Sequence, residues 1–193
     1  KIKQIVDAGE IGEIIKIHIN TQAWLSQLGT HYVDYALWMN GGKRAKWSVG
    51  HVHGPEKLTD NHPSPDFITG VVLLENGVRV YLECGYLSEQ NLTSEEFFFD
   101  NRLTVYGSHG YAWAETNGAW NAYTKTSGGK VIEGQEMKWP EEVPRIQALY
   151  LKDLADWLDG TLSYNPCNVE ISYHGYEILE GMCISALDNV RID

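Results

Sequence analysis

The hydrophobic positions change period twice along the chain, from helical spacing at the start to alternation in the middle and back to helical spacing at the end. Residues 1–8 have the spacing of an amphipathic helix that places three aliphatic side chains inward, Ile2, Ile5 and Val6. Gly9 follows them, a typical residue at a helix end. Residues 13–21 alternate and are predicted to form a half-buried strand with an inward face of Ile15, Ile17 and Ile19.

Turns that contain glycine divide the middle of the chain into short runs. Residues 67–74 are apolar on both faces, which indicates a strand in the interior of a sheet. Asn76-Gly77 is a strong hairpin signal, because both residues tolerate a positive φ angle. Further strands are predicted at residues 78–84, 97–99, 103–106, 111–115 and 120–126 and near Val131, with a second such turn at Asn117-Gly118. This regular spacing predicts an antiparallel sheet.

Two amphipathic helices are predicted at the end of the chain. The first stripe ends before Gly160 and consists of Ile146, Leu149, Tyr150, Leu154, Trp157 and Leu158. The second consists of Val169, Tyr173, Tyr176, Leu179, Met182 or Cys183, and Ala186. Helices at both ends with strands between them predict an α+β fold, a single domain over residues 1–193 in which an open, mostly antiparallel β-sheet has helices packed on one face. The other face carries Tyr and Trp side chains, and a large exposed aromatic patch usually marks a partner surface.

Charge and composition exclude several classes of partner. The chain has 193 residues, with 15 Lys and Arg against 26 Asp and Glu, a formal net charge of −11 and no basic run. Nucleic acids and anionic membranes attract clustered Lys and Arg, so neither is expected as a partner. No stretch approaches the ~20 apolar residues of a membrane span, and no secretory signal is visible. Three cysteines without metal-type spacing, Cys84, Cys167 and Cys183, favour reduced thiols and a cytoplasmic location.

The central stretch of the chain is residues 28–38, Leu-Gly-Thr-His-Tyr-Val-Asp-Tyr-Ala-Leu-Trp, which follows the first strand and is predicted to open a helix. Gly41 and Gly42 would end that helix. His31 falls in its predicted first turn, where the helix dipole disfavours a protonated imidazole. A neutral base or hydrogen-bond partner is one interpretation of His31. Simple packing is the other, and this stretch alone favours it.

Other histidines alternate on predicted strands. His18 lies on the outward face of the first strand, as a solvent-facing residue or as part of a site or interface. His51 and His53 share one strand face, and three further candidate ligands follow them, Asp60, His62 and Asp66. Imidazole and carboxylate together suit zinc, but nothing in the spacing holds a third ligand in place. A His-rich surface is therefore the favoured interpretation, and no metal site is predicted.

Two segments carry a family resemblance. Residues 9–15, Gly-Glu-Ile-Gly-Glu-Ile-Ile, then a strand, then residues 28–34, Leu-Gly-Thr-His-Tyr-Val-Asp, resemble the start of the C-terminal, substrate-binding domain of the Gfo/Idh/MocA family of NAD(P)-dependent oxidoreductases. Asn76-Gly77, residues 106–110 and the closing helices extend the resemblance over nearly the whole chain. No Gly-x-Gly-x-x-Gly follows a strand, and the chain begins with Lys inside a predicted helix. The N-terminal Rossmann domain is therefore expected to be absent from this chain, a piece of a longer protein.

The resemblance implies hydride transfer between NAD or NADP, in the full-length parent, and the carbon of a sugar, cyclitol or related polyol hydroxyl. His31 matches the family histidine that takes, or shares in taking, the hydroxyl proton, with a Lys of the nucleotide domain. The family commonly has Asp four residues before this His, and Gln27 stands there in this chain. Gln is neutral and can only form hydrogen bonds, so standard dehydrogenase chemistry is left open. No cofactor is expected to bind this chain alone.

Five residues are predicted to contact the substrate beside the catalytic His31: Gln22, Trp24, Gln27, Asp34 and Tyr86. Asp34 follows His31 by three residues on the same side of the helix, so it is either an orienting carboxylate or an ordinary helix-surface residue. Gln22, Trp24 and Tyr86 lie at predicted strand ends and loops, where they could contact a sugar or pack at the rim. The connection of residues 22–30 is shorter than usual for the family, which predicts a more open pocket.

The resemblance also implies that the open sheet face packs against a second subunit, giving a homodimer or homotetramer. Two functional interpretations follow. In one, the chain is the substrate-binding and oligomerisation domain of an oxidoreductase and is inactive alone. In the other, Gln27 and the short connection mark a non-catalytic binding or assembly module. A third possibility keeps the scaffold and uses the cofactor for elimination or glycoside cleavage.

Overall fold

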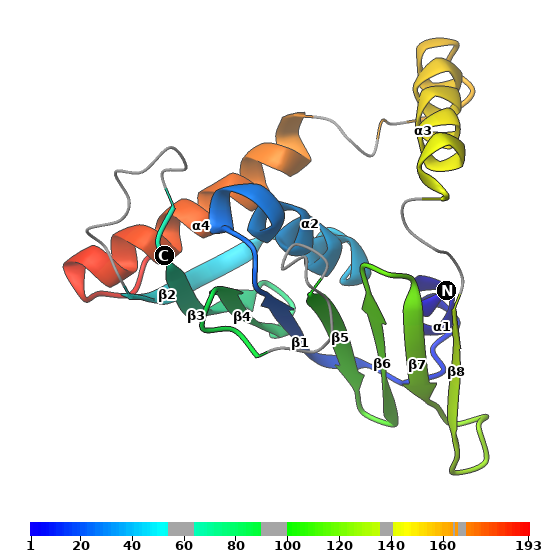
Figure 1. Cartoon of the computed structure of the whole chain (residues 1–193), viewed down its shortest axis with the longest axis horizontal. Coiled ribbons are helices and arrows are strands. Elements are labelled where there is room, and N and C mark those ends of the chain that lie inside the picture. Colours follow the sequence, from blue (N-terminus) through cyan, green and yellow to red (C-terminus); the bar gives the residue numbers. More distant parts are fainter. Residues whose placement is uncertain (54–63, 90–99, 136–140, 164, 166–168) are drawn as a thin grey trace.

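A single sheet forms the centre of the molecule (Figure 1). The structure is a computed structural model that describes residues 1–53, 64–89, 100–135, 141–163, 165 and 169–193. In these residues the sheet has eight strands in the order β2-β3-β4-β1-β5-β6-β7-β8. The strands are β1 (Ile14–Thr21), β2 (Ala45–His53), β3 (Phe67–Leu74), β4 (Arg79–Gly85), β5 (Asn101–Gly107), β6 (Gly110–Glu115), β7 (Ala119–Tyr123) and β8 (Val131–Gln135). Only β1 and β4 pair in parallel, so the predicted mostly antiparallel sheet is confirmed.

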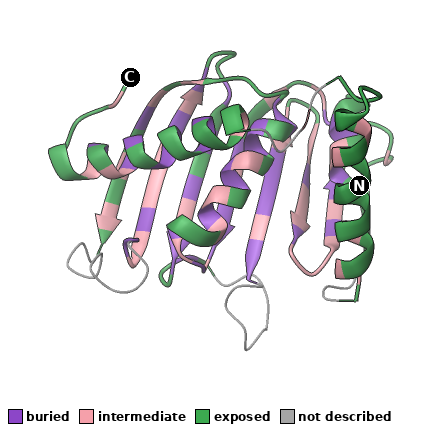
Figure 2. Cartoon of the chain, turned by 90° about the horizontal axis from the view of Figure 1, so that it is seen from above, coloured by how far each residue is buried: buried purple, intermediate pink, exposed green. Residues whose placement is uncertain are grey.

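Three helices lie on one face of this sheet, as Figures 1 and 2 show: α1 (Ile2–Asp7), α2 (Thr30–Met39) and α4 (Val169–Asp188). A short helical turn, η1 (Leu25–Gly29), leads into α2. The fourth helix, α3 (Val143–Leu158), stands to one side of the sheet. The α+β class and the open sheet are confirmed. Among the described helices, none is both long and apolar enough to cross a membrane.

Two glycines allow α4 to lie directly on the sheet. Gly50 of β2 and Gly70 of β3 are paired neighbours on the helix-covered face. A Cβ atom on Gly50 would lie 2.2 Å from the carbonyl oxygen of Met182, and one on Gly70 would lie 2.1 Å from its terminal methyl group. At Gly50 the neighbour is the backbone of α4, which cannot move aside, so the close approach of the helix requires glycine there. At Gly70 the nearest atom is the end of the flexible Met182 side chain. Met182 is fully buried against them.

The predicted turns are confirmed, with one refinement. Gly77 and Gly118 both have φ of +86°, and Gly77 N–H donates to the Leu74 carbonyl oxygen at 2.8 Å. Among the described non-glycine residues only Asn189 has a positive φ, so the glycine of each Asn-Gly pair adopts the left-handed conformation alone. Residues 97–99, predicted as a strand, lie outside the described residues.

Three expectations about buried faces were wrong. Ile15 is 53% exposed, because a bulge between Ile14 and Lys16 interrupts the alternation and turns Ile14 toward the core instead. On α4 the predicted stripe was wrong in its first half, where Tyr173 and Tyr176 are exposed, and it omitted the buried Ile178. Leu179 and Met182 are buried as predicted. On α3 no residue is buried (Figure 2). The helix exists as predicted, but its stripe is not covered by the described part of the chain.

Candidate functional site

The edge of the sheet at which β1 and β4 end carries the predicted site. These two strands are parallel neighbours with Thr21 opposite Cys84, so their carboxyl ends meet. The chain leaves β1 through residues 22–24, enters η1 and continues into α2, in which His31 is the second residue. The His31 side chain is exposed to solvent. An exposed imidazole beside two converging strand ends can reach a small molecule bound at this edge.

The helix that carries His31 begins earlier than predicted. Gly29 N–H donates to the Trp24 carbonyl oxygen at 3.3 Å, a wider helical turn, and Gly29 already has α-helical angles of −54° and −40°. Helical backbone is therefore continuous from Leu25 to Met39. The first free N–H groups belong to η1, and Ser26 N–H donates to the Ser64 hydroxyl at 3.3 Å. His31 therefore lies in the first turn of α2, as predicted, but η1 continues the helical backbone before it. The dipole argument, which needs free N–H groups at the helix start, does not apply to His31.

Tyr32 anchors α2 to the sheet edge beside His31. Its buried hydroxyl lies 2.8 Å from the Thr116 hydroxyl, which also accepts from the Asn101 side-chain amide at 3.1 Å. The Asn101 side-chain oxygen accepts from the Thr21 hydroxyl. Burial raises the pKa of Tyr32 above its usual range, so its hydroxyl remains neutral and acts as a hydrogen-bonding group.

Sequence reasoning missed this network of Thr21, Tyr32, Asn101 and Thr116. No local pattern could have found it, because its four polar groups come from a helix, two strands and a turn that are distant in sequence and meet only in the fold.

Asp34 lies half-buried between α2 and α4. A Cβ atom on Gly175 of α4 would be 2.8 Å from the Asp34 Oδ1 atom, so the carboxylate rests against the α4 backbone. Burial raises the pKa of Asp34, and the nearby charge of His31 acts in the opposite direction and lowers it. The close contact of the Asp34 carboxylate is thus with α4, and no hydrogen bond or ion pair joins it to His31 in the described part of the chain.

The other predicted substrate contacts are less closely grouped. The Gln22 side-chain amide donates to the Ser88 carbonyl oxygen at 3.3 Å, so the ends of β1 and β4 are tied together. Tyr86 follows β4, is 54% exposed and has its ring centroid 6.3 Å from that of His53. Trp24 is half-buried at the start of η1. Gln27 is exposed, and in the part of the chain that the structure describes no hydrogen bond joins it to His31.

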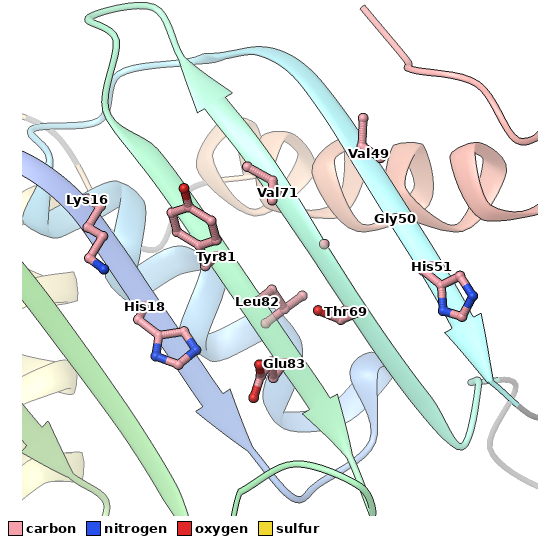
Figure 3. Close-up of a pocket in the computed structure, with 11 residues that line it drawn as sticks. Lys16, His18, Val49, Gly50, His51, Thr69, Val71, Tyr81, Leu82 and Glu83 are labelled. Carbon is pink, nitrogen blue, oxygen red and sulfur yellow. The ribbon is translucent and has the colours of Figure 1, made fainter.

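A separate depression of about 390 Å³ lies on the open face of the sheet (Figure 3). The polar side chains that line it come from β1, β2, β3 and β4: Lys16, His18, His51, Thr69, Tyr81 and Glu83. The Lys16 ammonium lies 4.4 Å from the centroid of Tyr106 and 5.9 Å from that of Tyr81. His18 thus faces outward, as predicted, on the side of the sheet away from α2 and His31.

No metal centre is formed by the described residues, in which no group of three or more His, Cys, Asp or Glu side chains could hold an ion. Asp60 and His62, two of the five candidate ligands, lie outside those residues. Cys84 and Cys183 are free thiols, and Cys167 is outside the described residues as well. Burial raises the pKa of both described thiols, to about 11 for Cys183, so they stay protonated at neutral pH.

Comparison with known proteins gives a family-model match for part of the chain. Residues 22–113 match the family model described as GFO/IDH/MocA C-terminal domain. This segment contains His31, Gln27, Asp34 and the strands β2 to β5. No curated protein matches the sequence.

Solved structures with low sequence identity share the fold. An oxidoreductase from Agrobacterium radiobacter in complex with NAD⁺, L-tartaric acid and magnesium is 15% identical, with a TM-score of 0.73 over 100% of this chain and 60% of its own. An NAD-binding oxidoreductase from Klebsiella pneumoniae is 14% identical, with a TM-score of 0.73 over 98% of this chain and 61% of its own. The transcriptional regulator Gal80p from Kluyveromyces lactis is 14% identical, with a TM-score of 0.73 over 99% of this chain and 56% of its own.

This chain thus spans only 56–61% of the length of these three proteins. At such identities the likeness establishes the fold alone. Two findings stand together: residues 22–113 match the model of the GFO/IDH/MocA C-terminal domain, and the chain as a whole shares its fold with these solved structures.

Proposed function

We propose that this chain is the substrate-binding and oligomerisation domain of an NAD(P)-dependent oxidoreductase that acts on a sugar, cyclitol or related polyol hydroxyl. The observation that carries the proposal is the exposed His31 at the joint end of β1 and β4, within the segment that matches the family. A hydroxyl gives up its proton as its carbon is oxidised, and a base within hydrogen-bond reach must accept it. In this proposal His31 is that base, and the candidate substrate contacts are Gln22, Trp24, Gln27, Asp34 and Tyr86.

The nicotinamide cofactor would be held outside this chain. The nearest approach to a glycine-rich turn is Gly107 to Gly110, and both glycines are used for packing within the domain. A Cβ atom would lie 2.1 Å from the Ile11 carbonyl oxygen at Gly107 and 1.9 Å from the Tyr123 carbonyl oxygen at Gly110. Neither glycine leaves its backbone open to a phosphate. In this proposal the contribution of the chain is to bind the polyol and to move its proton.

The test is turnover by the full-length protein that contains this chain. Reduction of NAD and of NADP is followed by absorbance across a panel of sugars and cyclitols, for the wild type, His31→Ala and the control His109→Ala. His109 is an exposed residue in the turn after β5, at the opposite end of the sheet from Tyr32 and Asn101. We expect turnover that falls by about 100-fold or more in His31→Ala only, the usual contribution of a general base. Absence of turnover with every substrate would overturn the proposal.

A non-catalytic binding or assembly module is the second candidate, favoured by Gln27 and by the shared fold of the transcriptional regulator Gal80p. A neutral Gln where the family has a carboxylate removes one charge from beside the imidazole. Bound cofactor without turnover on any substrate would support this module. Turnover without net oxidation of the polyol would support elimination or glycoside cleavage.

We further propose that the open face of the sheet packs against a second copy of the chain, as a homodimer or homotetramer, in the cytoplasm. The face carries a stack of Tyr106, Tyr111 and Tyr123, with neighbouring centroids 6.4 Å apart, and Arg102 over Trp113 at 4.5 Å. Tyr123 is 38% exposed, and the rings of Tyr106, Tyr111 and Trp113 are half-buried. A Tyr81→Glu, Tyr123→Glu double variant is expected to be monomeric in light scattering, and an unchanged mass would contradict the proposal.

A further inference from the structure

We infer that Asn101 is a positioning residue of the proposed site, which holds the connection after β1 (residues 22–24) and the start of α2 in one fixed arrangement. The connection carries the candidate substrate contacts Gln22 and Trp24, and α2 carries His31. The roles of these residues rest on the proposed function. Asn101 itself is fully buried at the first position of β5, and no feature of the sequence pattern pointed to it.

The side-chain amide of Asn101 joins two hydroxyl groups that belong to different parts of the site. Its oxygen accepts a hydrogen bond from the Thr21 hydroxyl, and its nitrogen donates to the Thr116 hydroxyl oxygen at 3.1 Å. Thr21 is the last residue of β1, and Thr116 is the first residue after β6. An amide has an acceptor on one side and a donor on the other, so a single side chain makes both bonds in a definite orientation.

From Thr21 the hydrogen bonds continue into the connection. The Thr21 hydroxyl gives its proton to Asn101, and its oxygen accepts from the Ala23 N–H at 3.3 Å. The Ala23 carbonyl oxygen accepts from the Cys84 thiol at 3.1 Å. Both backbone polar groups of Ala23 are thus held, and the two candidate substrate contacts lie on either side of this residue in the chain.

On the other side the hydrogen bonds reach α2. The buried hydroxyl of Tyr32, the residue after His31, lies 2.8 Å from the Thr116 hydroxyl. Two residues before His31, Gly29 lies against the thiol that also holds the connection, since a Cβ atom there would be 3.3 Å from the Cys84 Sγ atom. The backbone that carries His31 is therefore held on both sides, by contacts that also lead to the connection.

The network matters for the proposed reaction because a proton acceptor has to be placed closely. A misplacement of about 1 Å can cost about 100-fold in rate. Thr21 and Asn101 are fully buried, so a shift of the connection relative to α2 would leave their polar atoms without partners and away from water. The network opposes such a shift and thereby fixes where His31 lies relative to a substrate held by the connection.

The test removes single hydroxyl groups from the two ends of the network in the full-length protein. Thr21→Val keeps the shape of the side chain and loses its hydroxyl, and Tyr32→Phe does the same on α2. We expect each to lower kcat by about tenfold with KM changed by less than about threefold, because the base moves relative to the substrate while the contacting side chains remain. A wild-type kcat in either variant would overturn the inference.

Two controls separate the hydrogen bonds from packing. Thr21→Ser retains the hydroxyl, and Tyr35→Phe removes a hydroxyl from a tyrosine of the same helix that is 47% exposed. Both should keep kcat within about twofold of the wild type. A loss in Thr21→Ser as large as that in Thr21→Val would assign the effect to side-chain packing and would contradict a positioning role for the network.

A double variant tests whether Asn101 connects the two ends, since no hydrogen bond joins Thr21 directly to Tyr32 in the described residues. We expect Thr21→Val with Tyr32→Phe to lose about tenfold in kcat, as either single variant does, whereas independent effects would multiply to about 100-fold. In an Asn101→Ala background, Tyr32→Phe should change kcat by less than about twofold. Multiplied losses in the double variant would overturn the inference even where Asn101→Ala does not fold.

Hydrogen exchange in the 193-residue chain gives an arm that needs no activity. We expect the Ala23 amide to exchange at least about threefold faster in Tyr32→Phe than in the wild type, and at the wild-type rate in Tyr35→Phe. Equal Ala23 exchange in these two variants would overturn the inference. Inactivity of the wild-type full-length protein would instead overturn the proposed function, while Ala23 exchange would still decide whether the network links α2 to the connection.

Discussion

The two closing helices, α3 and α4, are both amphipathic, yet only one of them is packed. In α4 the buried side includes Ile178, Leu179 and Met182, which lie on β2, β3 and α2. In α3 no residue is buried, and Leu151 and Leu158 are 60% and 70% exposed. An apolar stripe therefore indicates which side of a helix needs cover, and it does not indicate which element provides it.

The difference comes from the sheet, whose surface on β2 and β3 lets α4 approach closely. Gly50 and Gly70 remove two side chains at the point of closest approach, and Ser185 accepts a hydrogen bond from Gly50 N–H at 3.1 Å. By contrast, α3 stands to one side of the sheet and none of its residues is buried (Figure 1). Helix stability in proteins comes largely from such tertiary packing, so the two helices should respond to mutation very differently.

The largest effect is expected from Gly50→Val, which places a branched side chain against the α4 backbone. The Cβ atom alone would lie 2.2 Å from the Met182 carbonyl oxygen, and backbone cannot move aside as a flexible side chain does. We expect a loss of about 4 kcal/mol or more in the free energy of unfolding, a large part of the total of a typical domain. Urea denaturation followed by circular dichroism measures it.

The matched control is His51→Val, the next residue of β2, whose side chain lies on the open face. It introduces the same side chain on the other side of the same strand, where β-branched residues are well tolerated. We expect a change of less than about 0.5 kcal/mol there. Equal losses of stability in the two variants would show that the β2 strand itself, rather than its contact with α4, is sensitive to the substitution.

The next effect is expected from Met182→Ala in α4. Met182 is fully buried, and truncation of a buried Met costs about 3 kcal/mol through lost burial and the cavity left behind. Chemical denaturation again gives the value, with Leu151→Ala in α3 as its counterpart. A small loss in Met182→Ala would mean that α4 settles into the space, and the contrast between the helices would then be weaker than the burial suggests.

Much of the fold could be predicted from periodicity because burial imposes it directly. Val78, Val80, Leu82 and Cys84 alternate in the sequence and are all buried on the helix side of the sheet. Ile15 failed because a bulge changes the phase of alternation and leaves no sign in the hydrophobic pattern. The stripe predicted for α4 failed in its first half because Tyr173 and Tyr176 are apolar enough to resemble core residues, whereas Leu179 and Met182 were predicted correctly.

The candidate site could be predicted only in part. His31 stood out through its position after a strand and through the family resemblance, and the Gly41-Gly42 helix end was correct, with φ of +68° and +72°. The contacts of Asp34 with Gly175 and of Tyr32 with Thr116 join segments more than 80 residues apart in sequence. Such contacts follow from the strand order, which the sequence pattern does not specify. The catalytic role of His31 stays a prediction.

A smaller effect is expected from His174→Phe, which removes the acceptor of the Ala45 N–H and keeps a ring of similar size. A partly buried N–H left without its partner costs about 1–2 kcal/mol. Thermal unfolding measures the loss, and His174→Asn offers a control that can still accept a hydrogen bond. If both variants lose the same stability, ring packing rather than the hydrogen bond holds this end of α4.

The smallest effect is expected on α3, where Leu151→Ser should change the free energy of unfolding by less than about 0.5 kcal/mol, since the side chain is already 60% exposed. Hydrogen exchange sharpens the contrast, because amides exchange slowly only where packing opposes local opening. In the 193-residue chain we expect the backbone amides of α3 to exchange much faster than those of α4. Protection of α3 equal to that of α4, or a loss above 1 kcal/mol in Leu151→Ser, would mean that its stripe is covered in solution. The close contact of α4 with Gly50 and Gly70 would then no longer explain why one helix is stable and the other is not.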